Sequence, residues 1–95
     1  MESESKPNLF HAGQLLATPG AMALLDASGV TPWSLLLRHV RGDWGNVSAE
    51  DQLENRLALQ HGDRLLSCYL VGGEKIWLIT EANRSSSTLL LPNEY

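Results

Sequence analysis

A polar segment near the end of the sequence carries the residues best suited to chemistry. Between Glu81 and Thr88, one guanidinium stands beside a run of hydroxyls. An arginine with hydroxyls and free backbone N–H groups can bind a phosphate or a carboxylate. The alternative interpretation is a solvated loop whose serines make local turn bonds. The candidate binding residues here are Glu81, Asn83, Arg84 and Ser85.

A ribonuclease-type enzyme would need a proton-transfer group close to Arg84. His39 or Tyr69 could move the proton, and Arg84 could stabilise the charge that develops on phosphorus. Ser86 or Thr88 could position the phosphate. The histidines are far apart in the sequence and lack the paired spacing of a zinc site, so we expect no metal. We also expect no cofactor, because the sequence has no Gly-rich phosphate loop and no nucleophile elbow.

The segment Gly42-Asp43-Trp44-Gly45 is a further candidate. Its glycines allow a sharp turn, so Trp44 can fold back onto the core. A tryptophan in such a loop can also anchor a protein partner, which makes Asp43 and Trp44 candidate binding residues. Folding back is the favoured interpretation, because glycines that end helices are common.

Composition narrows the possible classes of function. The chain has 95 residues and a net charge of -4, which argues against broad electrostatic binding to nucleic acid. The single cysteine, Cys68, excludes an intramolecular disulfide and fits a reducing compartment. No apolar run approaches the ~18 residues of a membrane span, and the acidic N-terminus is unlike a secretory signal. We expect a cytoplasmic protein with a disordered tail at residues 1–9 and a single domain at 10–95.

The candidate residues must be positioned by a short strand and three helices. Residues 14–17 form a short apolar run. Thr18-Pro19 and Thr31-Pro32 each combine an N-cap hydroxyl with a proline that begins a helix, and Gly29 and Gly42 end these helices. A capping box at 48–51 begins a third helix, which ends at Gly62.

The spacing of apolar residues predicts which helix faces are buried. In the second helix, Trp33, Leu36, Leu37 and Val40 recur at helical spacing and predict its inner face. In the third helix, Ala49, Leu53 and Leu57 are spaced by four and predict an inner stripe.

Apolar runs at 64–71, 75–80 and 88–91 predict three strands of an antiparallel meander. The run 64–71 is apolar on both faces, which predicts a central strand. The expected fold class is therefore α+β: a short N-terminal strand, three helices, then a C-terminal three-stranded antiparallel meander with the helices packed on one face.

Several motifs resemble a family of small uncharacterised proteins of plasmids, integrative elements and phages. The resemblance covers about residues 13 to 95. It rests on Gly42-Asp43-Trp44-Gly45, on the run from Lys75 to Ser85, on Leu90-Leu91-Pro92 and on Glu94-Tyr95. The family typically has aspartate at the position of Asn83 and threonine at that of Ser87. The resemblance implies a mobile genetic element as the setting, without a reaction. The element order also resembles small ribonucleases of the barnase, colicin and RelE type.

Two functional hypotheses follow. The first is a non-enzymatic accessory protein that binds a protein partner, for instance as an inhibitor of a host defence system of the CRISPR or restriction type. It expects a host or element-encoded protein partner, no direct nucleic-acid contact, no membrane and room for a homodimer. The second is a small ribonuclease in which Arg84 stabilises phosphate.

Overall fold

Each of the three helices begins at the hydroxyl residue that the sequence predicts. The computed structural model describes residues 7–95, with α1 at Pro19–Ser28, α2 at Pro32–Val40 and α3 at Ala49–His61. The side chains of Thr18, Thr31 and Ser48 each accept a hydrogen bond from a backbone N–H in the first helical turn. Gly29 and Gly62, both left-handed, end α1 and α3 as predicted.

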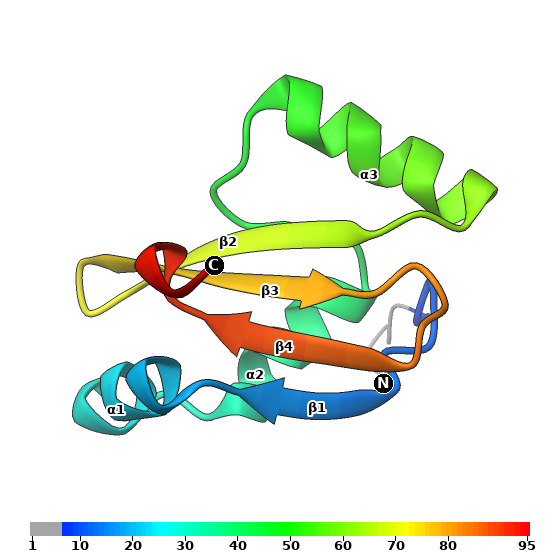
Figure 1. Cartoon of the computed structure of the whole chain (residues 1–95). Coiled ribbons are helices and arrows are strands. Elements are labelled where there is room, and N and C mark those ends of the chain that lie inside the picture. The colour runs from blue at the N-terminus through cyan, green and yellow to red at the C-terminus, as the bar shows by residue number, and fades with distance from the viewer. Residues whose placement is uncertain (1–6) are drawn as a thin grey trace, which may run out of the picture.

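The strands form one four-stranded mixed sheet (Figure 1). The strands are β1 at Gln14–Ala17, β2 at Leu65–Val71, β3 at Glu74–Thr80 and β4 at Ser86–Leu90, in the spatial order β1-β4-β3-β2. The run β2-β3-β4 is the expected antiparallel meander, whereas β1 adds to β4 in parallel. A short 3-10 helix, η1 at Pro92–Glu94, follows. The α+β class is confirmed.

The prediction that strand 64–71 lies at the centre of the sheet is wrong, because β2 is an edge strand. Its outer backbone groups are nevertheless covered. The side-chain amide of Asn55 on α3 bonds both the N–H and the carbonyl of Leu66. The segment around Gly45 bridges Cys68 in the next outward-facing position. This cover explains why an edge strand can be apolar on both faces.

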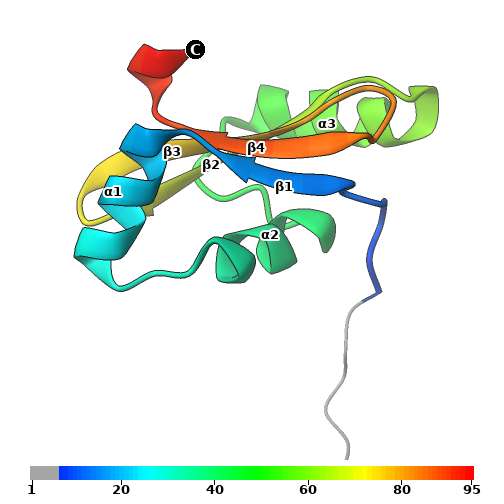
Figure 2. The same cartoon turned by 60° about the horizontal axis from the view of Figure 1, so that its bottom comes forward.

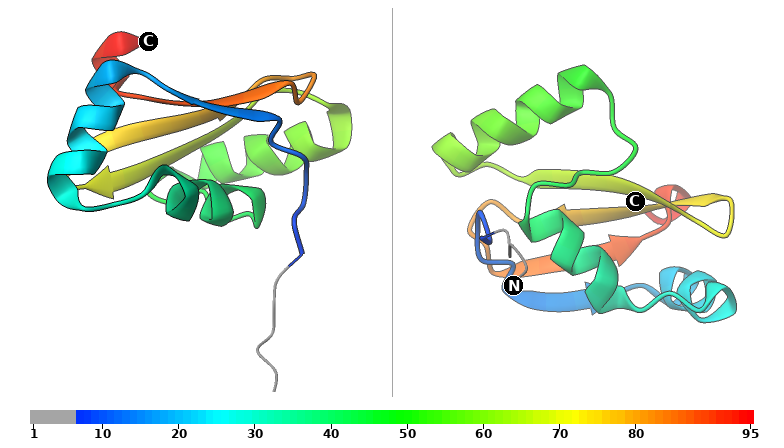
Figure 3. Two further views of the ribbon diagram at one scale, coloured as in Figure 1. Left: turned by 90° about the horizontal axis from the view of Figure 1, so that it is seen from below. Right: turned by 180° about the vertical axis from the view of Figure 1, so that it is seen from behind.

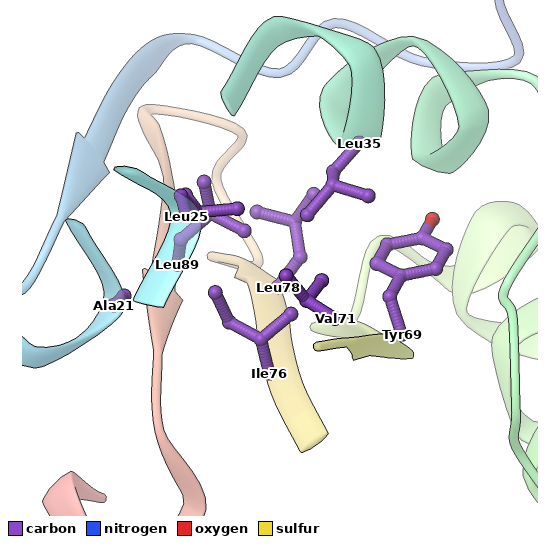
Figure 4. Packing of buried hydrophobic residues seen from close by; sticks show 8 residues of the cluster. All are labelled: Ala21, Leu25, Leu35, Tyr69, Val71, Ile76, Leu78 and Leu89. Carbon is purple, nitrogen blue, oxygen red and sulfur yellow. The ribbon is translucent and has the colours of Figure 1, made fainter. Parts of the chain in front are cut away.

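The main core lies between one face of the sheet and the helices α1 and α2 (Figures 2 and 3). Buried residues of α1, α2, β2, β3 and β4 meet there, and Figure 4 labels them: Ala21, Leu25, Leu35, Tyr69, Val71, Ile76, Leu78 and Leu89. A smaller cluster joins Trp44, Ala58 and Leu65 under α3. α3 lies beside the edge strand β2, and η1 lies on the sheet face away from α2 (Figures 1 and 3).

The predicted inner face of α2 is half right, because Val40 is buried and Leu36 packs against the main core. The structure buries Leu35, His39 and Val40 and leaves Trp33 and Leu37 exposed. The buried face includes His39 because both of its ring nitrogens form hydrogen bonds with hydroxyls of the sheet, so the polar side chain can be buried without losing its partners.

The predicted inner stripe of α3 is wrong. Asn55 and Ala58 are buried, while Ala49, Leu53 and Leu57 are exposed. The reason is that Asn55 must face β2 to pair with Leu66, and this orientation turns the leucines away from the protein.

Part of the expected N-terminal tail is placed by the structure. Residues 1–6 of that tail lie outside the described residues. The backbone N–H of Leu9 donates to the carbonyl of Val40 at 2.7 Å, so residues 8–12 run along α2. Within residues 7–95, no helix is long and apolar enough to cross a membrane.

Candidate binding site

His39 lies at the centre of a buried chain of hydroxyls. Ser67 on β2, Thr80 on β3 and Ser87 on β4 all lie on the sheet face that α2 covers. The Nδ1 atom of His39 is 2.6 Å from the Ser67 hydroxyl, and its Nε2 atom is 2.8 Å from the Thr80 hydroxyl. Thr80 in turn lies 2.6 Å from Ser87. All four side chains are buried, so a substrate could reach them only if α2 moved away.

The direction of each bond in this chain follows from its last member. Ser87 donates to the carbonyl of Ala12 at 2.7 Å, so its oxygen accepts from Thr80. The one hydrogen of the Thr80 hydroxyl goes to Ser87, so the Thr80 oxygen accepts from the Nε2–H of His39. The Nδ1 atom of His39 then carries no hydrogen and accepts from the Ser67 hydroxyl. His39 is thus a neutral imidazole. Burial, with a smaller contribution from the charge of Arg84, lowers the pKa of His39 to about 3.

Tyr69 and Asp43 are joined through the backbone. The Tyr69 hydroxyl donates to the carbonyl of Asp43 at 2.6 Å, and burial raises the pKa of Tyr69 to about 12. The Asp43 carboxylate bonds Arg38 at 2.7 Å and accepts from the N–H of Gly45 at 3.1 Å. Arg38 also lies over the Tyr69 ring, 4.5 Å from its centre. These contacts give the loop after α2 its shape.

Arg84 is bound to backbone carbonyls. Its Nη1 donates to Asp63, Glu81 and Ala82 at 2.7–3.1 Å, and its Nη2 donates to Ala58 at 3.2 Å. Arg84 also has a left-handed backbone with φ of 61°, which is uncommon for a residue other than glycine. The guanidinium therefore joins the end of α3 to the β3–β4 connection, and its hydrogen bonds are those of a structural residue.

The other candidates in the 81–88 segment have local roles or lie elsewhere. Asn83 Oδ1 accepts from the N–H of Ser85 at 3.0 Å, a bond that the aspartate typical of the resembled family would also accept. Glu81 forms an ion pair with Arg64. Ser86 and Thr88 alternate with Ser87 along β4 and so lie on the sheet face opposite His39.

The structure therefore does not bring the catalytic candidates together in an open cleft. His39 is buried, Tyr69 bonds a loop carbonyl, and the guanidinium of Arg84 is held by backbone carbonyls near the end of α3 and in the β3–β4 connection. Within residues 7–95, no group of His, Cys, Asp and Glu side chains could hold a metal ion.

The tryptophan that is available to a partner is Trp33. Trp44 is only 7% exposed and packs with Phe10 and His39, so it folds back onto the core. Trp77 is half-buried against the Tyr95 ring. Trp33 is 66% exposed, and Leu37, one turn further along α2, is 46% exposed. A wide exposed aromatic side chain beside a leucine is a common anchor for protein partners.

Trp33 stands at the rim of a groove between α2 and the N-terminal segment. The groove has a volume of about 330 Å³, at the small end of the range for binding pockets. Its lining residues come from two strips of chain: Asn8, Phe10, His11 and Ala12 from the N-terminal segment, and Trp33, Leu36, Leu37 and Val40 from α2. We call this feature the Trp33 groove.

A second hollow of about 270 Å³ adjoins the Trp33 groove through Leu37. It is lined by Leu37, Arg38, Arg41, Gly42 and Asp43. Arg38 is paired with Asp43, whereas Arg41 has no ion pair within residues 7–95, and its Nε is buried without a hydrogen-bond partner there. Because the guanidinium of Arg41 lines this hollow and has no ion pair within residues 7–95, this end of the groove favours a ligand with a carboxylate or carbonyl.

Comparison with protein-family models, curated proteins and solved structures found no match. We therefore infer the function from the geometry of the chain. Sequence reasoning missed the Trp33 groove because it assigned Trp33 and Leu37 to the core. One signal could have found it: α2 has more apolar residues than one buried face needs, because Leu35 lies outside the predicted stripe of Trp33, Leu36, Leu37 and Val40.

Proposed function

We propose that this chain is a non-enzymatic binding protein that holds a protein partner in the Trp33 groove. The observation that carries the proposal is the 66% exposure of Trp33 beside an apolar groove, in a molecule whose candidate catalytic groups are bonded internally. Exposed apolar patches rimmed by polar groups are typical of protein interaction sites. The net charge of -4 supports a protein partner over nucleic acid.

The motifs shared with small plasmid and phage proteins support a biological setting for this binding. In that setting the partner is a component of a host defence system of the CRISPR or restriction type, and binding inhibits it. The ribonuclease alternative gains no support from the positions of His39, Tyr69 and Arg84, because each has an internal partner.

Site-specific cross-linking tests the proposed surface. A photoreactive phenylalanine analogue replaces Trp33 in one variant and Leu70 in a matched control, since Leu70 is also exposed, at 58%, but lies on β2. Both variants are expressed in a bacterial host that carries defence systems. We expect position 33, and not position 70, to cross-link one protein stoichiometrically. Equal labelling of many proteins from both positions would refute the groove as the binding site.

A parallel assay separates the two hypotheses. The chain is expressed with and without the Arg84→Ala change, and the integrity of cellular RNA and growth are followed. A binding protein leaves RNA intact in both cultures. Degradation of RNA by the wild type, relieved by Arg84→Ala in a protein that is still folded, would favour the ribonuclease.

A further inference from the structure

The outer face of α3 is a second apolar surface that the fold leaves uncovered. Leu53 and Leu57 are 52% and 40% exposed and stand one helical turn apart. They lie on the side of α3 opposite the buried Asn55 and Ala58, so they point away from the sheet that α3 flanks. We call this surface the α3 ridge.

Acidic side chains border the α3 ridge. Glu50 precedes Leu53 by three residues, and Glu54 precedes Leu57 by three residues, so each carboxylate lies next to a ridge leucine. Both are exposed, and neither has an ion pair within residues 7–95. The ridge thus combines two aliphatic anchors with two carboxylates along one side, while Arg56, three residues after Leu53, borders its other side.

The Trp33 groove has the complementary properties. It is apolar along α2, and the adjoining hollow carries Arg41, whose Nε has no acceptor within the described residues. Helices bind grooves of this kind through leucines at i and i+4 spacing. Figure 3 shows α2 packed on one face of the sheet and α3 beside the edge strand β2, so the two helices that carry the groove and the ridge lie at separate places in one chain.

We infer that a second copy of this chain occupies the Trp33 groove, with its α3 ridge docked along α2 and its Glu50 or Glu54 facing Arg41. The contact is heterologous, because two different surfaces meet. It involves one short helix and one groove, so its area is at the low end for protein interfaces and its affinity is weak. The contact uses the groove of the proposed function but needs no foreign partner. A foreign partner would compete with it.

Sedimentation equilibrium of the full chain tests this contact. We expect a monomer at about 10 µM and reversible association toward 1 mM, which weakens as salt screens the carboxylate–guanidinium pairing. A groove variant, Trp33→Ala, and a ridge variant, Leu53→Gln with Leu57→Gln, should each be monomeric at every concentration. All the changed side chains are exposed, so both variants should retain the thermal melt of the wild type.

Mixing the two variants gives the decisive result. The groove variant retains an intact ridge and the ridge variant retains an intact groove, so an equimolar mixture should form a dimer and nothing larger. A charge exchange provides a matched pair: Arg41→Glu and Glu54→Arg should each weaken association, and the two mixed together should restore it. A mixture that stays monomeric would overturn the inference, as would association that persists in both single variants.

Nuclear magnetic resonance provides a second readout that needs no substitution. Raising the concentration of isotope-labelled wild-type protein should shift the backbone amide signals of α2 and α3 together. Shifts confined to the β1 edge or the η1 face would overturn the contact. A chain that is monomeric throughout, but whose position 33 cross-links a foreign protein, would refute self-association and leave the proposed function standing. Self-association without any foreign protein cross-linked to position 33 would refute the proposed function and support the contact between copies.

Discussion

The side-chain amide of Asn55 pairs with Leu66 as a neighbouring strand would. Its Nδ2 donates to the Leu66 carbonyl at 2.7 Å, and its Oδ1 accepts from the Leu66 N–H at 3.0 Å. One side chain on α3 thus satisfies both outward backbone groups of an edge-strand residue, and it fixes which face of α3 is turned outward. The exposed α3 ridge is a consequence of this pairing.

Asn55→Ala should destabilise the fold by roughly 2 to 4 kcal/mol, because it leaves two backbone groups of β2 without partners. Asn55→Asp should have a different signature. Its carboxylate can still accept from the Leu66 N–H but opposes the Leu66 carbonyl, so stability should recover as the acid is protonated. Urea unfolding of both variants at neutral and acidic pH measures this. A cost below about 1 kcal/mol for Asn55→Ala would contradict the role given to this pair.

Gly45→Ala should destabilise the chain more than Gly73→Ala. Both glycines have positive φ, 74° and 81°, so both changes carry the same backbone strain of about 1 to 2 kcal/mol. An added Cβ at Gly45 would lie 2.3 Å from the carbonyl oxygen of Cys68, whereas nothing lies within 4 Å at Gly73. The difference in the free energy of unfolding between the two variants therefore reports the clash with β2. Equal costs would mean that the Gly45 segment does not seal this edge.

The free energy of unfolding should decrease as the pH is lowered below about 6.5, and the protonation of His39 should be a main cause. Its pKa is about 3 in the folded protein against an ordinary 6.5. The unfolded chain therefore takes up the proton first, and the stability contributed by neutral His39 is lost as pH falls from 6.5 towards 3. At about 1.4 kcal/mol per pH unit, the loss is roughly 2 to 3 kcal/mol by pH 4.5.

The matched variants for this prediction are His39→Gln and His61→Gln. His61 is exposed at the end of α3, so its replacement is the control for the loss of a histidine that is not buried. His39→Gln should be less stable at neutral pH and should lack most of the slope between pH 6.5 and 4.5. The same slope in both variants would show that the carboxylates alone produce it.

Arg84→Ala should cost roughly 2 to 4 kcal/mol, because hydrogen bonds to the carbonyls of Ala58 on α3, of Asp63 just after it, and of Glu81 and Ala82 are lost. Arg84→Lys should be almost as damaging, since an ammonium cannot reproduce the planar guanidinium's spread of donors. Arg56→Ala, an exposed arginine on α3, is the control and should be nearly neutral. Thermal melts of the three variants decide the matter, and a neutral Arg84→Ala would return Arg84 to the list of functional candidates.

Two tryptophans should differ in their effect on folding. Trp44→Ala removes a buried ring from the cluster with Ala58 and Leu65 and should cost about 3 to 5 kcal/mol. Trp33→Ala removes a ring that is mostly in water and should cost less than about 1 kcal/mol. Chemical denaturation of both variants provides the measurement. A large cost at Trp33 would mean that the ring packs in solution, and the Trp33 groove would lose its anchor.

Local signals in the sequence were sufficient to predict where the helices begin and which strands form the meander. Thr18-Pro19, Thr31-Pro32 and Ser48 begin the helices because capping depends on residues within one turn. The antiparallel meander could be predicted because β2 and β3 are joined by the glycine pair Gly72-Gly73.

The orientation of the helices and the place of β1 could not be predicted in the same way. His39 is buried because it meets Ser67 and Thr80, which are 28 and 41 residues away. Asn55 is buried because Leu66 lies on an exposed edge. Hydrophobic periodicity assigns such polar residues to the surface, so it predicts an incorrect orientation of α2 and α3 about their axes. The Trp33 groove was missed for this reason, since its rim had been assigned to the core.

The parallel pairing of β1 with β4 also affects how the protein is made. Within residues 7–95, β1 pairs with β4, and the hydroxyl of Ser87 on that strand donates to the carbonyl of Ala12, 75 residues earlier in the chain. On the ribosome, residues 14–17 therefore have no strand to join until residues 86–90 have emerged. The sheet is completed only after residues 86–90 have been synthesised, and until then the apolar sides of α1 and α2 lack Leu89 of β4 in the main core.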